Sequence, residues 1–198
     1  MRKIDIILAL ITGEATAGLF YILFKDSATG IEFFGLILAI LLPILAILGL
    51  WLSWVLGKRF LFIFQAAKFL LIGILATLVD LGVLNLLMWL SGTERGLFYS
   101  IFKGISFVVA TCAKYWGNKF WAFEKREMAG VGKEFTQFFL VTLIGLAINV
   151  AIASLVVNTI GPQFGLSEKI WANVGGIIAA IIGSLWNFIG YKFIVFRR

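Results

Sequence analysis

Two lysines lie inside one apolar stretch, where a charged side chain has to be explained. Lys103 and Lys114 are eleven residues apart, which at about 100° per residue returns to within about 20° of the same helix face. Both ammonium groups would face one groove, separated by roughly 16 Å along the axis. A charge inside a membrane span costs on the order of 2.5 to 3.5 kcal/mol on insertion scales, so each lysine needs a partner, a wet cavity or a task. A phosphate with a resting place near each leaflet is one such task, although Lys103 is close enough to its helix end to snorkel to the head groups instead.

The last two thirds of the chain contain a repeat, which pairs several polar residues. The segment from Lys68 to Asp80 is matched 69 residues later by Gln137 to Asn149, and Gly117-Asn-Lys-Phe-Trp-Ala-Phe123 is matched 73 residues later by Gly190-Tyr-Lys-Phe-Ile-Val-Phe196. The resulting pairs are Asp80 with Asn149, Lys114 with Asn187, and Lys119 with Lys192. Repeated membrane hairpins are typical of transport proteins with a site between the halves. We predict two copies of one helical hairpin, repeat 1 at about 66–123 and repeat 2 at about 135–196.

The paired positions predict two kinds of site. A polar core is expected where the copies meet, formed by Asp80, Asn118, Asn149 and Asn187. Asp80 could instead be a counter-ion to Lys103 or Lys114, or a proton carrier. Lys119 and Lys192 each precede a phenylalanine, so their ammonium groups can reach a lipid phosphate while the stems lie among acyl chains. Anchoring by the positive-inside rule would explain the same two residues. The predicted set for binding lipid phosphate is Lys103, Lys114, Lys119 and Lys192.

Glu14 lies at the centre of the first apolar stretch and has no counterpart in the repeat. It resembles the membrane glutamate of proton-coupled exporters and is the candidate proton site. The alternative is that burial raises the pKa of this carboxyl and keeps it protonated.

The composition is that of an integral membrane protein. Apolar residues make up 62% of the chain and charged residues 14%, where soluble domains average about half and about a quarter. Six stretches are each long enough to cross a hydrocarbon core about 30 Å thick, at residues 4–24, 33–57, 66–90, 98–120, 136–158 and 170–193. Backbone groups in lipid must be bonded internally, and no series of alternating ten-residue strands is visible. The predicted fold is therefore all-α, a polytopic transmembrane bundle of six helices.

The basic residues predict the topology. The net charge is +7, and the lysines and arginines gather at helix ends, so they indicate orientation in a lipid bilayer and no nucleic-acid partner. With the N-terminus in the cytoplasm, eleven lysines and arginines lie on the inner side and four on the outer side. We expect a multi-pass protein of the cell (inner or plasma) membrane with both termini cytoplasmic. With no histidine and one cysteine, no metal site and no cofactor are expected.

The chain is expected to divide near residue 60. Residues 1–60 form an accessory two-helix hairpin without a counterpart, and residues 61–198 form a four-helix domain. Because each copy crosses the membrane twice, the two copies are parallel repeats. The loops are too short to hold a catalytic domain, which disfavours an enzyme.

Residues 63–198 resemble the GtrA-like family of small four-helix membrane proteins. The resemblance rests on Phe69-Leu-Leu-Ile-Gly with Asp80, Phe138-Phe-Leu-Val with Asn149, and the two hairpin closes from Trp116 to Phe123 and from Trp186 to Phe196. The family typically ends each hairpin with Asn-Phe, a basic residue and an aromatic-x-Phe close. Asn187-Phe188 fits, whereas the first copy has Lys114-Tyr115 there.

The resemblance implies a part in cell-surface polysaccharide synthesis. The leading hypothesis is translocation, or flipping, of a polyprenyl-phosphate-linked sugar or of the polyprenyl-phosphate carrier between leaflets, with membrane lipids as the surroundings. One alternative is a proton-coupled exporter of a small solute, using Glu14 and Asp80. Another is a non-transporting scaffold for a membrane glycosyltransferase, and assembly as a homo-oligomer stays open.

Overall fold

The computed structural model describes residues 1–24, 31–92, 96–165 and 168–197. The side chains beside these gaps, and those of a few helical residues including Lys103, lie outside the description. Within it, the chain is all-helical, as predicted. The α-helices are α1 (Lys3–Phe24), α2 (Ile31–Gly57), α3 (Leu61–Ser91), α4 (Gly96–Gly117), α5 (Val131–Ser154) and α6 (Glu168–Gly190).

The helices coincide with the six expected spans. Four stretches in the described residues have the length and hydropathy to cross a membrane, namely Gly35–Gly57, Leu61–Ser91, Val131–Ile160 and Ile178–Val195. The helices α1 and α4, of 22 residues each, occupy the other two predicted spans. Helix α3 ends where Gly92 adopts a left-handed backbone conformation, with φ of 65°, which a glycine tolerates at a helix end. The protein is therefore a membrane protein built from apolar helices.

Three short π-helices continue the α-helices: η1 (Asn118–Ala122), η2 (Leu155–Ile160) and η3 (Tyr191–Val195). Two of them, η1 and η3, fall on the duplicated hairpin close. Each ends with a phenylalanine N–H that donates to the carbonyl five residues earlier, from Phe123 to Asn118 at 2.9 Å and from Phe196 to Tyr191 at 2.7 Å. Such π turns are rare and are often found at functional sites. The repeated sequence thus forms a repeated local structure.

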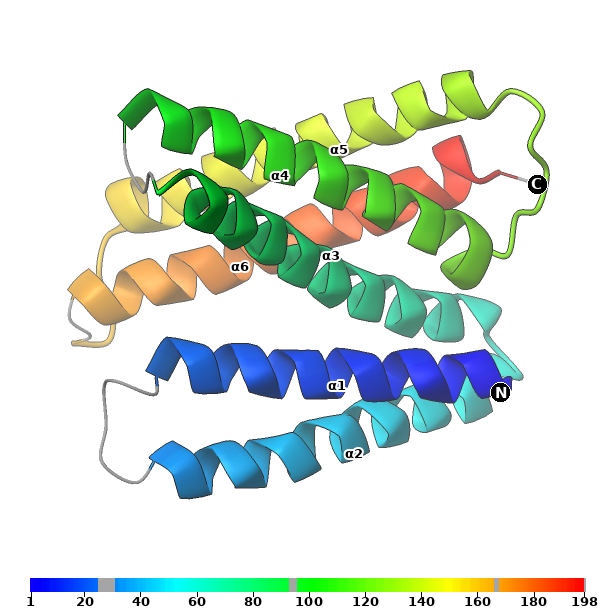
Figure 1. Cartoon of the computed structure of the whole chain (residues 1–198). Helices are drawn as coiled ribbons and strands as arrows, with labels where there is room; N and C mark the ends of the chain where they lie inside the picture. Colours follow the sequence, from blue (N-terminus) through cyan, green and yellow to red (C-terminus); the bar gives the residue numbers. More distant parts are fainter. Residues whose placement is uncertain (25–30, 93–95, 166–167, 198) are drawn as a thin grey trace. The chain divides into compact units, whose positions relative to one another are not determined.

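The chain forms two compact units, Met1–Glu124 and Lys125–Arg198. In the first unit, α1 and α2 form a hairpin, α3 and α4 form another, and both α1 and α2 pack on α3 (Figure 1). The N-terminal hairpin therefore shares a unit with the first copy of the repeat. A domain division near residue 60 stays a prediction from the sequence.

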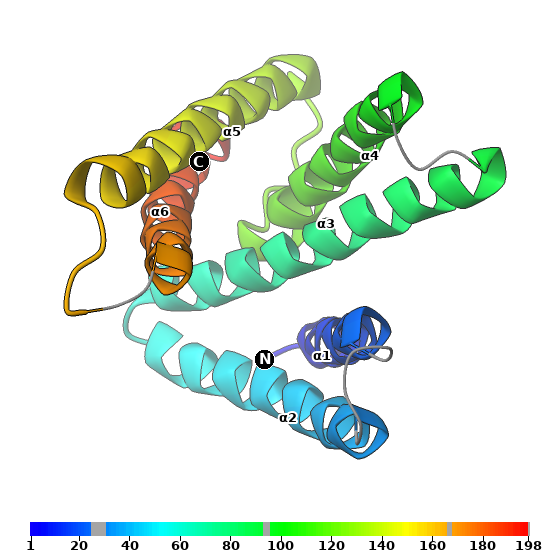
Figure 2. The same cartoon turned by 90° about the vertical axis from the view of Figure 1, so that its left-hand side faces the viewer.

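The second unit is the α5–α6 hairpin, whose helices lie side by side in both views (Figures 1 and 2). The two helices are held at one end by the Trp171 indole N–H, which donates to the Val156 carbonyl at 2.8 Å. At the opposite end, η3 follows α6 directly.

In both hairpins a glycine before the π-helix lets the partner helix approach. A Cβ on Gly117 would lie 3.1 Å from Cγ2 of Ile72, and a Cβ on Gly190 would lie 2.5 Å from Cγ1 of Val141. Ile72 and Val141 are themselves counterparts in the repeat. A larger residue would force the helices apart, so glycine at this position fixes the close contact in both copies.

Candidate functional site

The polar residues near the middle of the helices lie within their own hairpins. In the first unit, the Ser106 hydroxyl of α4 donates to Oδ1 of Asp80 on α3 at 2.6 Å. In the second unit, Asn149 on α5 lies against Gly183 of α6, where an added Cβ would be 3.4 Å from the Asn149 Cβ. Ser106 is fully buried, as is its counterpart Ala179. The first copy thus crosses its hairpin with a hydrogen bond where the second packs small groups.

Each hairpin buries an asparagine side-chain oxygen near its π-helix: Asn118 begins η1, and Asn187 lies on α6 one turn before η3. Lys114 is half-buried on α4, and its backbone carbonyl accepts from Nδ2 of Asn118 at 2.8 Å. Among the described residues, neither Oδ1 of Asn118 nor Oδ1 of Asn187 has a hydrogen-bond partner. Asn187 fits closely against Gly145, where an added Cβ would overlap its amide. A buried acceptor left unsatisfied costs about 1 to 3 kcal/mol, so each oxygen is suited to a donor from outside the hairpin.

The two lysines of the duplicated close have different surroundings. Lys119 is fully buried, with its ammonium 5.9 Å from the Tyr115 ring centre. Lys192 is only half-buried and lies 5.9 Å from the Phe188 ring and 5.6 Å from the Phe193 ring. Lys192 therefore suits a phosphate at the surface, whereas Lys119 belongs to the interior of its unit. The side chain of Lys103 lies outside the described residues.

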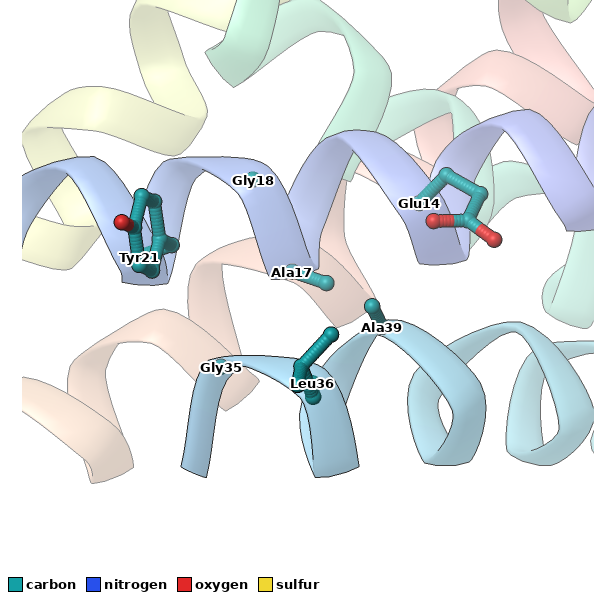
Figure 3. A pocket seen from close by; sticks show the side chains of 7 residues that line it. All are labelled: Glu14, Ala17, Gly18, Tyr21, Gly35, Leu36 and Ala39. Atoms are coloured by element: carbon teal, nitrogen blue, oxygen red, sulfur yellow. The ribbon is translucent and has the colours of Figure 1, made fainter. Parts of the chain in front are cut away.

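Glu14 lies on α1 of the N-terminal hairpin, outside the repeat that contains the residues described above. It is exposed on α1 and lines a cleft between α1 and α2 that includes Tyr21 (Figure 3).

The sequence did not predict a charged cluster in the first unit. We call Arg2, Asp5, Lys68, Trp121 and Glu124 the Asp5 cluster. Asp5 and Lys68 are each 1% exposed, and Nζ of Lys68 lies 3.2 Å from Oδ1 of Asp5. That oxygen also accepts from the Trp121 indole N–H at 2.7 Å, while Oδ2 accepts from the Arg2 backbone N–H at 2.6 Å. Oε1 of Glu124 accepts from Lys68 at 3.1 Å and from Arg2 at 2.8 Å.

The Asp5 cluster fastens the N-terminal hairpin to the repeat. Asp5 belongs to α1, Lys68 to α3 and Trp121 to η1, so three elements meet at one carboxylate. The Lys68 ammonium also lies 4.2 Å from the Phe64 ring centre, a cation–π contact. A buried ion pair is tolerated when hydrogen bonds satisfy its remaining polar atoms, as they do here. The sequence clue was that Lys68 has the uncharged Gln137 as its counterpart.

The second unit holds its equivalent end with aromatic rings. Phe138 on α5 stacks on Tyr191 with ring centres 4.4 Å apart, and Phe196 contacts both rings at 6.3 Å. The Tyr191 and Thr142 hydroxyls share a hydrogen bond of 2.6 Å. At the start of the unit, Nζ of Lys125 pairs with Oε2 of Glu134 at 2.7 Å.

The apolar helices and the duplicated hairpin close define a polytopic helical membrane protein. Its last two hairpins also match a known family: residues 68–196 match the family model described as GtrA/DPMS, transmembrane domain. The chain belongs to this family, which confirms the resemblance seen in the sequence. Membership indicates a membrane role in the processing of polyprenyl-linked sugars. Comparisons with curated proteins and with solved structures gave no match.

Proposed function

We propose that this protein moves a polyprenyl-phosphate-linked sugar, or polyprenyl phosphate itself, between the two leaflets of the cell membrane for cell-surface polysaccharide synthesis. The observation that carries the proposal is that Lys114 and Asn118 lie one helical turn apart in the same hairpin. Lys114 brings a cation into the last turn of α4, which occupies one of the spans predicted from the sequence. Asn118 offers a buried carbonyl oxygen without a partner among the described residues.

The Lys114 ammonium and the Asn118 amide oxygen suit the two polar parts of the transported lipid, its phosphate and its sugar. An ammonium compensates a phosphate charge, which is expensive to bury alone. An amide oxygen accepts a hydrogen bond from a sugar hydroxyl. The prenyl tail needs no such help because it is as apolar as the lipid. No bond is made or broken, so the role requires no catalytic residue.

Lys192 supports a surface step. Its half-buried ammonium lies beside two phenylalanine rings, so a lipid phosphate can be bound while the rings contact acyl chains. With both termini in the cytoplasm, as the basic residues favour, this step is at the inner leaflet.

The test uses purified protein in liposomes and measures leaflet exchange of a polyprenyl-phosphate sugar. A hydrogen bond to a charged group contributes about 1.5 to 3 kcal/mol, so Lys114→Ala should slow exchange by about ten- to hundredfold. Lys114→Arg keeps the charge and should retain most of the rate. Lys133→Ala, which changes an exposed lysine of α5, is the matched control and should leave exchange unchanged.

Two results would overturn the proposal in favour of the alternatives. Absent exchange together with a glycosyltransferase that co-purifies with the chain would indicate a scaffold. Absent exchange together with a solute flux driven by a pH gradient and lost in Glu14→Gln would indicate an exporter. Mass spectrometry of lipids extracted with the protein adds an independent check, since a carrier should retain polyprenyl phosphate.

A further inference from the structure

The N-terminal hairpin holds a cleft that neither the family match nor the proposed function uses. It lies between α1 and α2, before residues 68–196, and has a volume of about 440 Å³. Its lining combines one carboxylate, one aromatic ring and small or apolar groups: Glu14, Ala17, Gly18, Tyr21, Gly35, Leu36 and Ala39. Figure 3 shows Ala17 and Ala39 pointing toward one another across the hairpin, with Glu14 and Tyr21 on either side of Ala17 along α1.

Close backbone contacts at its two ends shape the cleft. Gly13 packs so tightly on α2 that an added Cβ would overlap the Pro43 backbone. Further along, a Cβ on Gly35 would lie 2.8 Å from Cδ2 of Tyr21, so this ring rests directly on the α2 backbone. Between these two contacts the lining includes the small residues Ala17, Gly18 and Ala39. The helices are thus held close while their small side chains leave room between them.

The lining of α1 follows one helix face. Glu14, Ala17, Gly18 and Tyr21 are spaced at three, four and seven residues, which places them on the same side of the helix. The carboxylate and the ring therefore open to the same cleft, two turns apart, or roughly 10 Å along the axis.

Among the described residues, nothing compensates the charge of Glu14. It lies eleven residues into α1, roughly 16 Å from the helix start, so its depth is near the middle of the span. No described residue forms an ion pair or a hydrogen bond with its side chain. An ionised carboxylate at this depth calls for a cation or a proton.

We propose that this cleft binds a lipophilic monovalent cation, such as an alkyl- or arylammonium compound. The Glu14 carboxylate supplies the opposite charge, and the Tyr21 ring supplies a π face. The apolar lining selects a cation with a hydrocarbon body over a hydrated metal ion. The proposal is independent of lipid translocation.

The test measures equilibrium binding of tetraphenylphosphonium to the detergent-purified full chain. Tetraphenylborate, which has the same shape and the opposite charge, is the control ligand. We expect one phosphonium ion bound per chain and no saturable binding of the borate. Because a charged contact contributes about 1.5 to 3 kcal/mol, Glu14→Gln should weaken phosphonium binding by about tenfold or more.

Two further variants keep the test decisive. Ala39→Phe fills the cleft while keeping the Glu14 carboxylate in the chain, and it should also abolish binding. Glu127→Gln removes an exposed acid from the segment before α5 and should change nothing. Equal binding of both ions, or full phosphonium affinity in Glu14→Gln, would overturn the proposal. Lipid exchange measured in Glu14→Gln should equal that of the wild type, so failure of either proposal can be recognised separately.

Discussion

The α3–α4 and α5–α6 hairpins end in the same backbone structure but hold that end with different chemistry. Each has a π-helix, a phenylalanine after it and a glycine packed on the partner helix. In the first hairpin, Lys68 and Trp121 at this end bind the buried Asp5 carboxylate. In the second, the matching positions are Gln137 and Ile194, and a stack of aromatic rings fills the space.

The difference shows what the duplicated sequence preserves and what it leaves free. The glycine and the i→i+5 turn set how closely two helices approach, and both copies keep them. The side chains around that turn depend on what each hairpin must hold. The first hairpin supports an additional pair of helices and uses charge to fix them, whereas the second has its own rings to pack.

The largest effect is expected at the Asp5 cluster. Asp5→Ala leaves the Lys68 ammonium buried beside a vacated position and removes the acceptor of the Trp121 indole. Breaking one partner of a buried pair costs about 3 to 5 kcal/mol, so the free energy of unfolding in detergent should fall by that amount. Chemical denaturation followed by tryptophan fluorescence measures it.

The matched control for this change is Arg2→Ala. The Arg2–Glu124 pair is about two-fifths exposed on both sides, and surface pairs contribute about 0 to 1 kcal/mol. If Arg2→Ala destabilised the protein as much as Asp5→Ala, the cluster would not owe its strength to the buried pair.

An intermediate effect is expected from alanine at the two packed glycines. The added methyl would lie closer to Val141 in Gly190→Ala, at 2.5 Å, than to Ile72 in Gly117→Ala, at 3.1 Å. Overpacking costs about 1 to 3 kcal/mol, so Gly190→Ala should destabilise the protein more than Gly117→Ala. Thermal unfolding of both variants gives the order, and Val141→Ala should rescue Gly190→Ala. The reverse order would show that the first hairpin is the tighter one.

Apart from the Arg2→Ala control, the smallest effect is expected from the aromatic end of the second hairpin. Tyr191→Phe keeps the ring stack and removes the hydroxyl bonded to Thr142, which retains its bond to the Phe138 carbonyl at 2.8 Å. The net loss should be about 0.5 to 1.5 kcal/mol, measured by the same denaturation. A loss as large as that of Asp5→Ala would mean that the hydroxyl pair, rather than the rings, holds this end.

The sequence predicted the helices and the repeat well because both depend on local patterns. Runs of about 20 apolar residues fixed the six helices to within a few residues, and the pairing of Gly117 with Gly190 located the duplicated close. The backbone conformation of the duplicated close could not be predicted, because the amino-acid sequence alone does not distinguish an α turn from a π turn.

The candidate site was predictable only in part. The repeat identified Asp80 and Asn149 as polar residues at equivalent positions. The contact of Asp80 with Ser106 within one hairpin could not be predicted, because it depends on how α3 and α4 face one another. Lys119 and Lys192 were indistinguishable in the repeat and differ in burial, because what covers each lysine comes from distant residues. Asp5 could not be connected with Lys68 and Trp121, since nothing local relates residues so far apart in the chain.

The distance along the chain between members of the Asp5 cluster bears on how the protein is made. Asp5 and Trp121 are 116 residues apart, whereas the Lys125 and Val195 contact in the second unit spans 70. At synthesis rates of about 5 to 20 residues per second, Asp5 waits on the order of ten seconds for its indole donor. Until then the Asp5 carboxylate lacks its indole donor, and Lys68, once translated, lacks the oxygens of Trp121 and Glu124 that it contacts. The insertion machinery therefore has to accommodate an unfinished first unit until η1 and Glu124 have been translated.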